Sequence, residues 1–265
     1  MRLVSFQGGF GQVVGDDLVP MGPDLVDYLA GAAVIPGKPR PLAGIALTAP
    51  VPKPGKVICI GLNYRDHVAE LGLPMPQQPV VFAKWCNSVV GPDATVRIPT
   101  ASSQIDFEVE LGVIIGQRIS RVDKVDALKA VGGYTVVNDL SARDLQFSGS
   151  QWTYGKAIDG FLPMGPVLVT ADEVPDPQAL ALGCTVNGEQ RQRSSTAEMV
   201  FGVADLISYL SQVMTLEPGD LIATGTPPGV AMGDKEPRWL QPGDNVTVWV
   251  EGIGELTTHL IAEPG

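Results

Sequence analysis

The feature of this sequence that most constrains its fold is a strand-like run at residues 107–116, FEVELGVIIG. Side chains alternate between two faces along a strand, so Phe107 and the apolar residues that follow it at every second position share one face, while Glu108 and Glu110 share the other. Like charges on one face repel each other, unless a carboxyl group takes up a proton or a bound cation offsets the charge. Carboxylate oxygens without Cys or His suit a hard ion such as Mg²⁺, Mn²⁺ or Ca²⁺. The alternative is an ordinary strand with a solvated outer face that carries two acids.

The composition predicts a turn-rich protein with mainly β structure. Of the 265 residues 45% are hydrophobic, and 31 Gly and 23 Pro separate many short apolar runs. The net charge of −11 opposes binding to nucleic acid or to an anionic membrane. Cys59, Cys86 and Cys184 form neither a zinc pattern nor a disulfide framework, which favours a reducing cytoplasm. We expect no signal peptide at the start of the chain and no segment that spans a bilayer.

Changes of pattern along the chain predict two parts, a small N-terminal domain with a proline-rich connecting arm at residues 1–52 and a larger domain at residues 53–265. The first part has strand patterns at 1–6 and 11–15 and a short helix at 24–31. The second part begins with a buried strand at 57–61 and continues as a mainly antiparallel set of strands, so the expected fold class is α+β, mainly β. Helices are expected at 122–131 and 198–214, and the weakly periodic residues 145–162 are expected to cover a site.

Of the two histidines, His67 is the candidate for catalysis, whereas His259 follows a terminal strand pattern and is expected to be structural. His67 lies on a short predicted helix that Asn63 is expected to cap, with Glu70 three residues later on the same face. A carboxylate beside an imidazole orients it and raises its basicity, as a general base requires. The alternative is a surface His–Glu pair without function.

Further candidates follow the strand pattern at residues 134–139. Asp139 ends this strand and is a third carboxylate for a metal site with open positions. Arg143 and Gln146 follow it at helical spacing and are candidates to bind a carboxylate and a carbonyl of a substrate. Lys156 lies in a glycine-bounded loop, where it has no evident structural role. The segment TGTPPG at 224–229 is either a simple loop or a turn that binds an oxyanion.

A series of motifs that occur in one order, over about residues 55–260, closely resembles the fumarylacetoacetate hydrolase family, in its acylpyruvase and 2-hydroxyhepta-2,4-diene-1,7-dioate isomerase-like branch. These motifs are GLNYRDHVAELG, PVVFAKW, DFEVELGVIIG, GYTVVNDLSARDLQ, YGKAIDGFLPMGP, NGEQRQ and DLIATGTPPGV. The resemblance implies a mixed β-roll with a small N-terminal lobe, and a homodimer.

The same resemblance implies a role for each candidate residue. Glu108, Glu110 and Asp139 match the ligands of Mg²⁺ or Mn²⁺, for which Ca²⁺ is a substitute. The catalytic candidates are His67 and Glu70, which match a water-activating dyad on a segment that closes over the site, and Lys156. The candidates for substrate binding are Arg143, Gln146, Tyr64 and Thr226.

The function that these residues predict is a metal-dependent hydrolase that cleaves a C–C bond of a small 2,4-dioxo acid, of acylpyruvate or fumarylpyruvate type, to pyruvate and a carboxylic acid. The alternatives are an oxaloacetate-type decarboxylase, a 2-hydroxyhepta-2,4-diene-1,7-dioate isomerase and, more remotely, a non-catalytic metal-binding protein. Trp85 and Cys86 depart from the family pattern and are expected in the core. Residues 148–154 and 231–239 are the expected specificity segments, and residues 63–78 the expected mobile lid.

Overall fold

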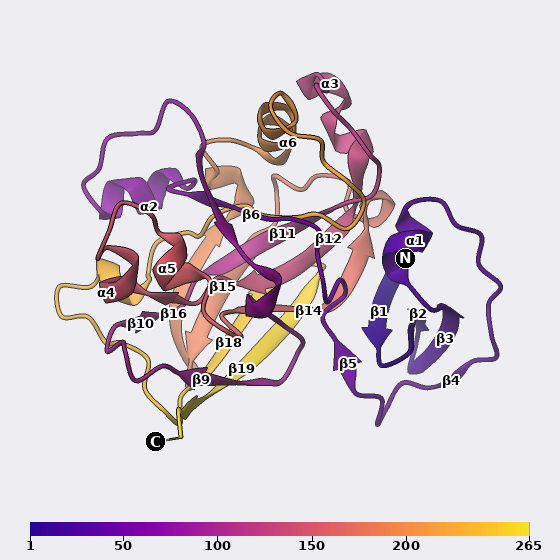
Figure 1. The fold of residues 1–265 in the computed structure, drawn as a ribbon, viewed down its shortest axis with the longest axis horizontal. Helices are drawn as coiled ribbons and strands as arrows, with labels where there is room; N and C mark the ends of the chain where they lie inside the picture. Colours follow the sequence, from indigo (N-terminus) through magenta and orange to yellow (C-terminus); the bar gives the residue numbers. More distant parts are fainter. Residues whose placement is uncertain (265) are drawn as a thin grey trace.

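A sheet of 12 strands runs through the part of the chain that the computed structural model describes, residues 1–264 (Figure 1). Its main path is β4 (Arg40–Pro41), β3 (Asp17–Gly22), β2 (Gly9–Val14), β1 (Arg2–Phe6), β14 (Leu162–Thr170), β12 (Val131–Asn138), β11 (Val109–Ile115), β17 (Leu221–Ala223), β6 (Val57–Gly61) and β7 (Val80–Lys84). Off this path, β5 (Leu47–Thr48) pairs with β1 and β8 (Val89–Val90) with β14. Most neighbours are antiparallel, as predicted.

A second sheet packs against the middle of the first. It consists of β16 (Glu189–Ser195), β15 (Ala181–Val186), β18 (Asn245–Val250), β19 (Gly254–Ala262) and β9 (Ala94–Ile98). The apolar face of β11 predicted from alternation, with Val109, Leu111 and Val113, shares one buried cluster with Leu182 and Val248 of this second sheet. A two-stranded ladder of β10 (Ile105–Asp106) and β13 (Ser141–Ala142) lies beside them.

The opposite face of β11 is also buried, so the alternative interpretation of a strand with a solvated outer face is wrong. Ile114 on that face belongs to a second apolar cluster together with Val137 of β12 and Leu221 of β17. Glu108 and Glu110 are themselves buried. Two acids in a strand that is covered on both sides need cationic or hydrogen-bonding partners, because burial of an unpaired charge is costly.

Short helices cover the sheets and their connections. They are α1 (Leu25–Leu29), α2 (Arg65–Glu70), α3 (Lys124–Ala127), α4 (Arg143–Gln146), α5 (Thr153–Lys156) and α6 (Val203–Ser211), with 3₁₀ turns η1 (Cys86–Ser88), η2 (Leu128–Ala130), η3 (Ala171–Glu173), η4 (Thr196–Glu198) and η5 (Ala231–Gly233). None of the helices formed by residues 1–264 has the length and hydropathy of a membrane span. The prediction of an α+β, mainly β fold is confirmed.

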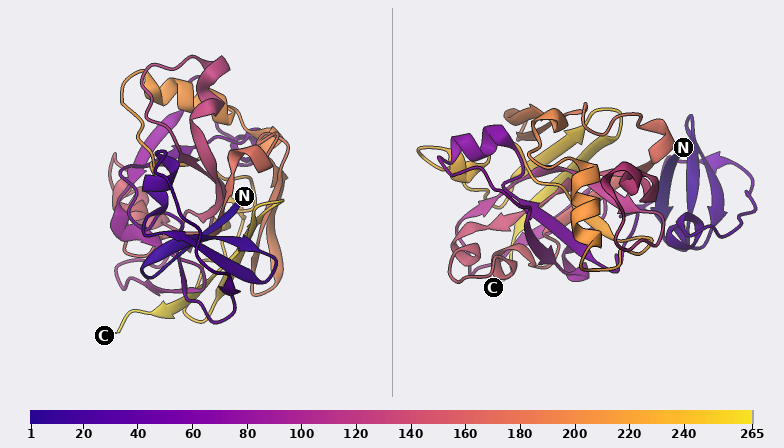
Figure 2. Two further views of the ribbon diagram at one scale, coloured as in Figure 1. Left: turned by 90° about the vertical axis from the view of Figure 1, so that its right-hand side faces the viewer. Right: turned by 90° about the horizontal axis from the view of Figure 1, so that it is seen from above.

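The N-terminal strands lie at one end of the molecule but continue its large sheet (Figure 2). β1 pairs with β14 in antiparallel register, with Arg2 opposite Val169. Leu3 and Phe10 belong to the same buried cluster as Ile114 of β11. The division into domains at residue 52 stays a prediction, and residue 265 lies outside the described residues.

Two expectations about helix ends are wrong. The helix expected over 198–214 is the shorter α6, because Gly202 begins it with its N–H donated to Asp205 Oδ2 at 3.2 Å, while η4 forms a separate turn before it. Asn63 does not cap α2, since its Nδ2 donates instead to Thr224 O at 2.7 Å and to Phe201 O at 3.0 Å. Its side chain thereby ties the start of the α2 segment to two distant loops.

Candidate active site

Three carboxylates converge where β11 begins and β12 ends. The two strands are antiparallel with Val109 opposite Asn138, so the residue after β12, Asp139, comes to lie beside Glu108. The backbone N–H of Asp139 donates to Glu108 O at 2.9 Å. The carboxylates of Glu108, Glu110 and Asp139 each offer an oxygen within 4.8 Å of the other two, and all three residues are buried. The prediction that these acids form one cluster is confirmed.

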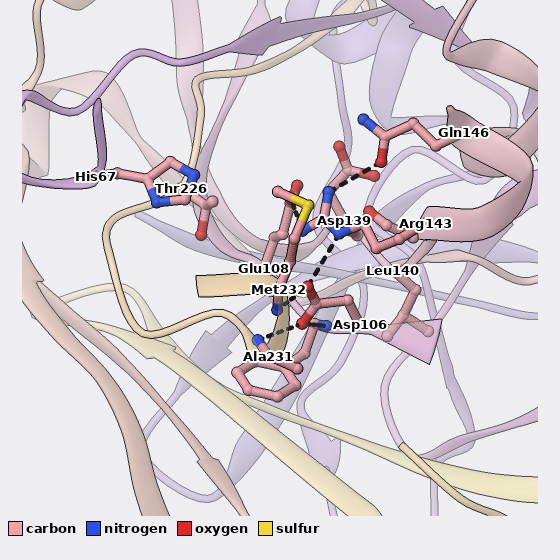
Figure 3. A network of polar contacts seen from close by, with 12 residues as sticks. His67, Asp106, Glu108, Asp139, Leu140, Arg143, Gln146, Thr226, Ala231 and Met232 are labelled. Atoms are coloured by element: carbon pink, nitrogen blue, oxygen red, sulfur yellow. Dashed lines mark hydrogen bonds and ion pairs between the residues drawn. The ribbon is translucent and has the colours of Figure 1, made fainter. Parts of the chain in front are cut away.

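Two cations predicted as site residues bind this cluster directly, and Figure 3 shows one of them, Arg143. Arg143 donates from Nη2 to Glu108 Oε1 at 2.6 Å. Lys156 donates from Nζ to Glu108 Oε2 at 2.6 Å and to Asp139 Oδ2 at 3.0 Å. Helices α4 and α5 therefore supply the positive charge that two buried acids require.

The charges of the cluster set the pKa values of its members. Burial would raise the pKa of Glu108, but the charges of Lys156 and Arg143 outweigh it and hold that pKa below its usual value. Burial alone would lower the pKa of Lys156. The charges of Asp139 and Glu108 outweigh burial and raise that pKa above its usual value, so the ammonium stays charged. For Glu110, burial raises the pKa well above its usual value, and the charges of Asp139 and Glu108 add to that rise.

Glu110 is the acid that most needs a further cation. Its carboxylate accepts a hydrogen bond from Gly225 N at 2.9 Å, and within residues 1–264 it forms no ion pair. A divalent ion would stabilise its ionised form, and three carboxylates without Cys or His form the donor set of a hard ion. The residues therefore fit a metal of the Mg²⁺ or Mn²⁺ kind, with Glu108, Glu110 and Asp139 to hold it.

Helix α2 brings the predicted His67–Glu70 dyad to the same cavity. The imidazole Nδ1 of His67 lies 2.9 Å from Glu70 Oε2, and this leaves Nε2 as the nitrogen available to the cavity that the ring lines. Glu70 is fixed in turn, because its Oε1 accepts from Gly229 N at 3.0 Å. A Cβ at Gly233 would lie 2.7 Å from the Glu70 carboxyl carbon, so a larger residue at position 233 would displace the carboxylate from this position.

A buried lysine that the sequence interpretation did not assign to the site binds Asp139 from the opposite side. Lys84, at the end of β7, donates to Asp139 Oδ1, to Leu140 O at 2.8 Å and to Phe161 O at 2.7 Å. Burial lowers its pKa, and the charge of Asp139 opposes that effect. The strand pattern VVFAK indicates that Lys84 ends a strand, but nothing in the sequence indicates that Lys84 pairs with Asp139.

A fourth buried acid, Asp106, was also missed. Its carboxylate accepts from Arg143 Nε at 2.9 Å and from the backbone N–H groups of Ala231 at 2.7 Å and Met232 at 3.1 Å (Figure 3). Asp106 thus connects the guanidinium of Arg143 to η5, the turn that contributes Met232 to the cavity. Asp106 lies two residues before Glu108, and this strand-like spacing could have indicated that both acids lie on the same face.

The cavity has a volume of about 550 Å³ including its open mouth. Of the predicted substrate-binding residues, Arg143, Gln146 and Thr226 line it. The Thr226 hydroxyl donates to Val109 O at 3.0 Å, which directs it toward β11. Both predicted specificity segments reach the cavity, with Trp152 from the first and Met232 from the second.

Three other residues do not lie where the sequence placed them. Tyr64 is fully buried in the apolar core, and it is not among the residues that line the cavity. Trp85 and Cys86, expected in the core, are exposed, because the chain turns into η1 directly after Lys84 and leaves them outside.

Comparison with known proteins assigns the fold and the motifs to one family. Residues 56–261 match the family model described as Fumarylacetoacetate (FAA) hydrolase C-terminal. A curated protein of Burkholderia lata, whose name describes it only as a candidate hydrolase, is 51% identical over 228 residues, which cover 85% of this chain and 79% of that protein.

Solved structures agree over nearly the full chain. The fumarylacetoacetate hydrolase of Exiguobacterium antarcticum has a TM-score of 0.90 and 36% identity, and the match covers 99% of this chain and 100% of that one. The 2-hydroxyhepta-2,4-diene-1,7-dioate isomerase of Mycobacterium marinum has a TM-score of 0.84 and 35% identity, with 100% and 98% covered. The chain therefore belongs to the fumarylacetoacetate hydrolase family.

Proposed function

We propose that this protein hydrolyses the C3–C4 bond of a small 2,4-dioxo acid and releases pyruvate and a carboxylic acid. The observation that carries the proposal is the His67–Glu70 dyad, whose buried imidazole lines one cavity with the carboxylates of Glu108 and Glu110. A site that only bound a metal would not need an oriented imidazole in the same cavity. The non-catalytic alternative is therefore the weaker one.

The proposed reaction adds water across one carbon–carbon bond. His67 takes a proton from water through Nε2, while Glu70 holds the ring and stabilises the imidazolium that forms. The water oxygen bonds to C4 of the substrate, and the C3–C4 bond breaks with its electron pair moving to C3. The acyl half leaves as a carboxylic acid, and C3 takes a proton to complete pyruvate.

Negative charge develops on the pyruvate half as the bond breaks. A divalent ion held by Glu108, Glu110 and Asp139 would supply Lewis-acid stabilisation of that charge. Lys156 presents a charged ammonium at the cavity wall, and Arg143 and Gln146 present N–H donors beside it. These groups bind and orient the carboxylate and the 2-oxo group of the substrate in a site with little water.

Decarboxylation and isomerisation remain alternatives within the family, and two isomerases are among the solved relatives. Neither reaction consumes water, so neither needs a base that deprotonates it. The dyad therefore favours hydrolysis over decarboxylation, while an isomerisation could use the same base to move a proton within the substrate.

The test compares two reactions in one variant. His67→Ala is expected to lower kcat for acetylpyruvate hydrolysis by about 10²–10⁴-fold, the usual effect of losing a general base. Any decarboxylation of oxaloacetate should change much less. His259→Ala is the matched control, because His259 lies on β19 of the second sheet and bonds Asn245. An unchanged ratio of the two activities in His67→Ala would refute the role of His67 in activating water, and no hydrolysis of any acylpyruvate by the wild type with Mg²⁺ would refute the function.

A further inference from the structure

Much of the cavity beyond the charged cluster is lined by large apolar side chains. Six of them form a surface that we call the apolar wall, namely Leu71, Leu73, Phe82, Phe147, Trp152 and Met232. They come from five separate segments: the chain after α2, strand β7, the chain after α4, the chain before α5, and turn η5. Apolar side chains gathered from so many elements around one cavity suit an apolar part of a ligand.

The aromatic part of this wall is held in place by packing. Trp152 lies edge-on to Phe82 with ring centroids 5.4 Å apart, and edge-on to Phe147 at 6.4 Å. A Cβ on Gly61 would lie 2.4 Å from the Trp152 ring, so the indole sits directly over a glycine of β6. The Lys156 ammonium lies 5.1 Å from the centre of the Phe82 ring, which places the wall next to the charged cluster.

The positive groups of the cavity are already paired. Arg143 donates to Asp106, Glu108 and Gln146, and Lys156 donates to Glu108 and Asp139. Among the described residues that line the cavity, no other Lys or Arg is present. The substrate's 2-oxo carboxylate has these two cations beside it, but a second carboxylate against the apolar wall would have none. Leu73 and Phe147 of this wall are exposed, whereas its other four residues are half-buried. A carboxylate packed on the half-buried part would lose solvation without gaining a partner, which is unfavourable.

From this division of the lining we infer that the substrate is a monocarboxylate, a 2,4-dioxo acid whose acyl group is an uncharged alkyl or aryl group packed on the apolar wall. The inference rests on the proposed function for the reaction, but it concerns a different part of the molecule. It excludes fumarylpyruvate, oxaloacetate and other diacids as preferred substrates.

The first experiment compares succinylpyruvate with isocaproylpyruvate, in which an isopropyl group replaces the terminal carboxylate without a change of shape. With Mg²⁺ present, kcat/KM for isocaproylpyruvate should be higher by at least about 10-fold, the scale on which pockets discriminate such groups. Equal or faster hydrolysis of succinylpyruvate would overturn the inference and leave the proposed function intact.

A binding experiment tests the inference about the acyl group independently of the proposed reaction. Calorimetry in Mg²⁺ measures the affinity of 2-oxoadipate and of the 2-oxo acid in which an isopropyl group replaces its distal carboxylate, neither of which has the 4-oxo group that hydrolysis requires. Tighter binding of the isopropyl acid, without turnover of any acylpyruvate, would refute the proposed function and support the inference. Equal binding, or tighter binding of 2-oxoadipate, would overturn the inference.

A variant tests the placement of the acyl group. Met232→Lys puts an ammonium into the apolar wall at a partly exposed position, and should shift the ratio of kcat/KM toward succinylpyruvate by at least about 10-fold. Met75→Lys is the matched control, since Met75 is exposed and does not line the cavity. A ratio unchanged in Met232→Lys would overturn the assignment of this wall to the acyl group.

Discussion

Lys84 is the buried cation whose removal best tests how the carboxylate cluster is stabilised. Its side chain and that of Asp139 are both fully inaccessible to solvent, and its ammonium makes hydrogen bonds to Asp139, Leu140 O and Phe161 O. Lys84→Met keeps most of the volume and removes the charge. The variant therefore leaves one carboxylate short of a partner and two buried carbonyl groups without their donor.

The expected loss follows from these contacts. Breaking a buried ion pair by removing one partner costs about 3–5 kcal/mol. Asp139 keeps Lys156 at 3.0 Å, which lowers the loss, and the two carbonyl groups, each worth about 1–3 kcal/mol if unsatisfied, raise it. We expect the free energy of unfolding to fall by about 3–5 kcal/mol without metal, a large part of the stability of an ordinary domain.

Urea unfolding in EDTA and in saturating Mg²⁺ measures the effect. Because a bound divalent ion would replace the missing positive charge beside Asp139, Mg²⁺ should recover at least about 1 kcal/mol of the loss. Lys129→Met is the matched control, since Lys129 pairs with Asp126 on the surface and such a pair contributes less than about 1 kcal/mol. A loss in EDTA no larger than that of the control, or one that Mg²⁺ leaves unchanged, would refute the reasoning.

Three further predictions concern the cluster and its surroundings. Because burial raises the pKa of Glu110, its contribution to stability is present below the usual carboxyl pKa and is lost as pH rises toward the folded-state pKa. In EDTA the melting temperature of wild type relative to Glu110→Gln should therefore fall as pH rises above the usual carboxyl pKa, and Mg²⁺ should remove that trend. Asp106→Asn leaves the buried Arg143 Nε without its carboxylate, so it should lower the melting temperature in EDTA and, in protein that is still folded, lower kcat/KM by about 10–100-fold; an unchanged kcat/KM would contradict its positioning role. Amide exchange in residues 63–78 should be faster than in Val109–Ile115, and its rate should decrease when oxalate and Mg²⁺ are added. Exchange that is equally slow in both segments would contradict a mobile lid.

Alternation along one strand was enough to predict part of the site. It assigned Glu108 and Glu110 to one face of β11, and the strand-end position of Asp139 supplied the third carboxylate. Alternation assigns a side chain to a face, but it does not reveal what covers that face. Here Glu108 is paired with Arg143 and Lys156, from two helices that lie far from it in the sequence, and the rest of that face is covered by apolar side chains of neighbouring strands.

The errors at helix ends and in the core have the same origin. Asn63 has the sequence signature of a helix cap, but its side-chain hydrogen bonds go to Phe201 and Thr224, which are brought to it by the tertiary fold. Trp85 and Cys86 are apolar enough for a core, but they follow the last residue of an edge strand, where no second layer covers them. Local composition predicts burial only where a neighbouring element is available.

The charges of the site connect the metal to the class of substrate. The cluster contains four buried acids and three buried cations, which are Asp106, Glu108, Glu110, Asp139, Lys84, Arg143 and Lys156. With every group ionised the cluster has one excess negative charge, and a divalent ion changes this to one excess positive charge. The carboxylate of a monoacid then brings the buried site to neutrality, whereas a diacid leaves an uncompensated negative charge against apolar side chains. Since uncompensated charge is costly in a buried site, the same cluster that favours a divalent ion also favours a substrate with a single carboxylate.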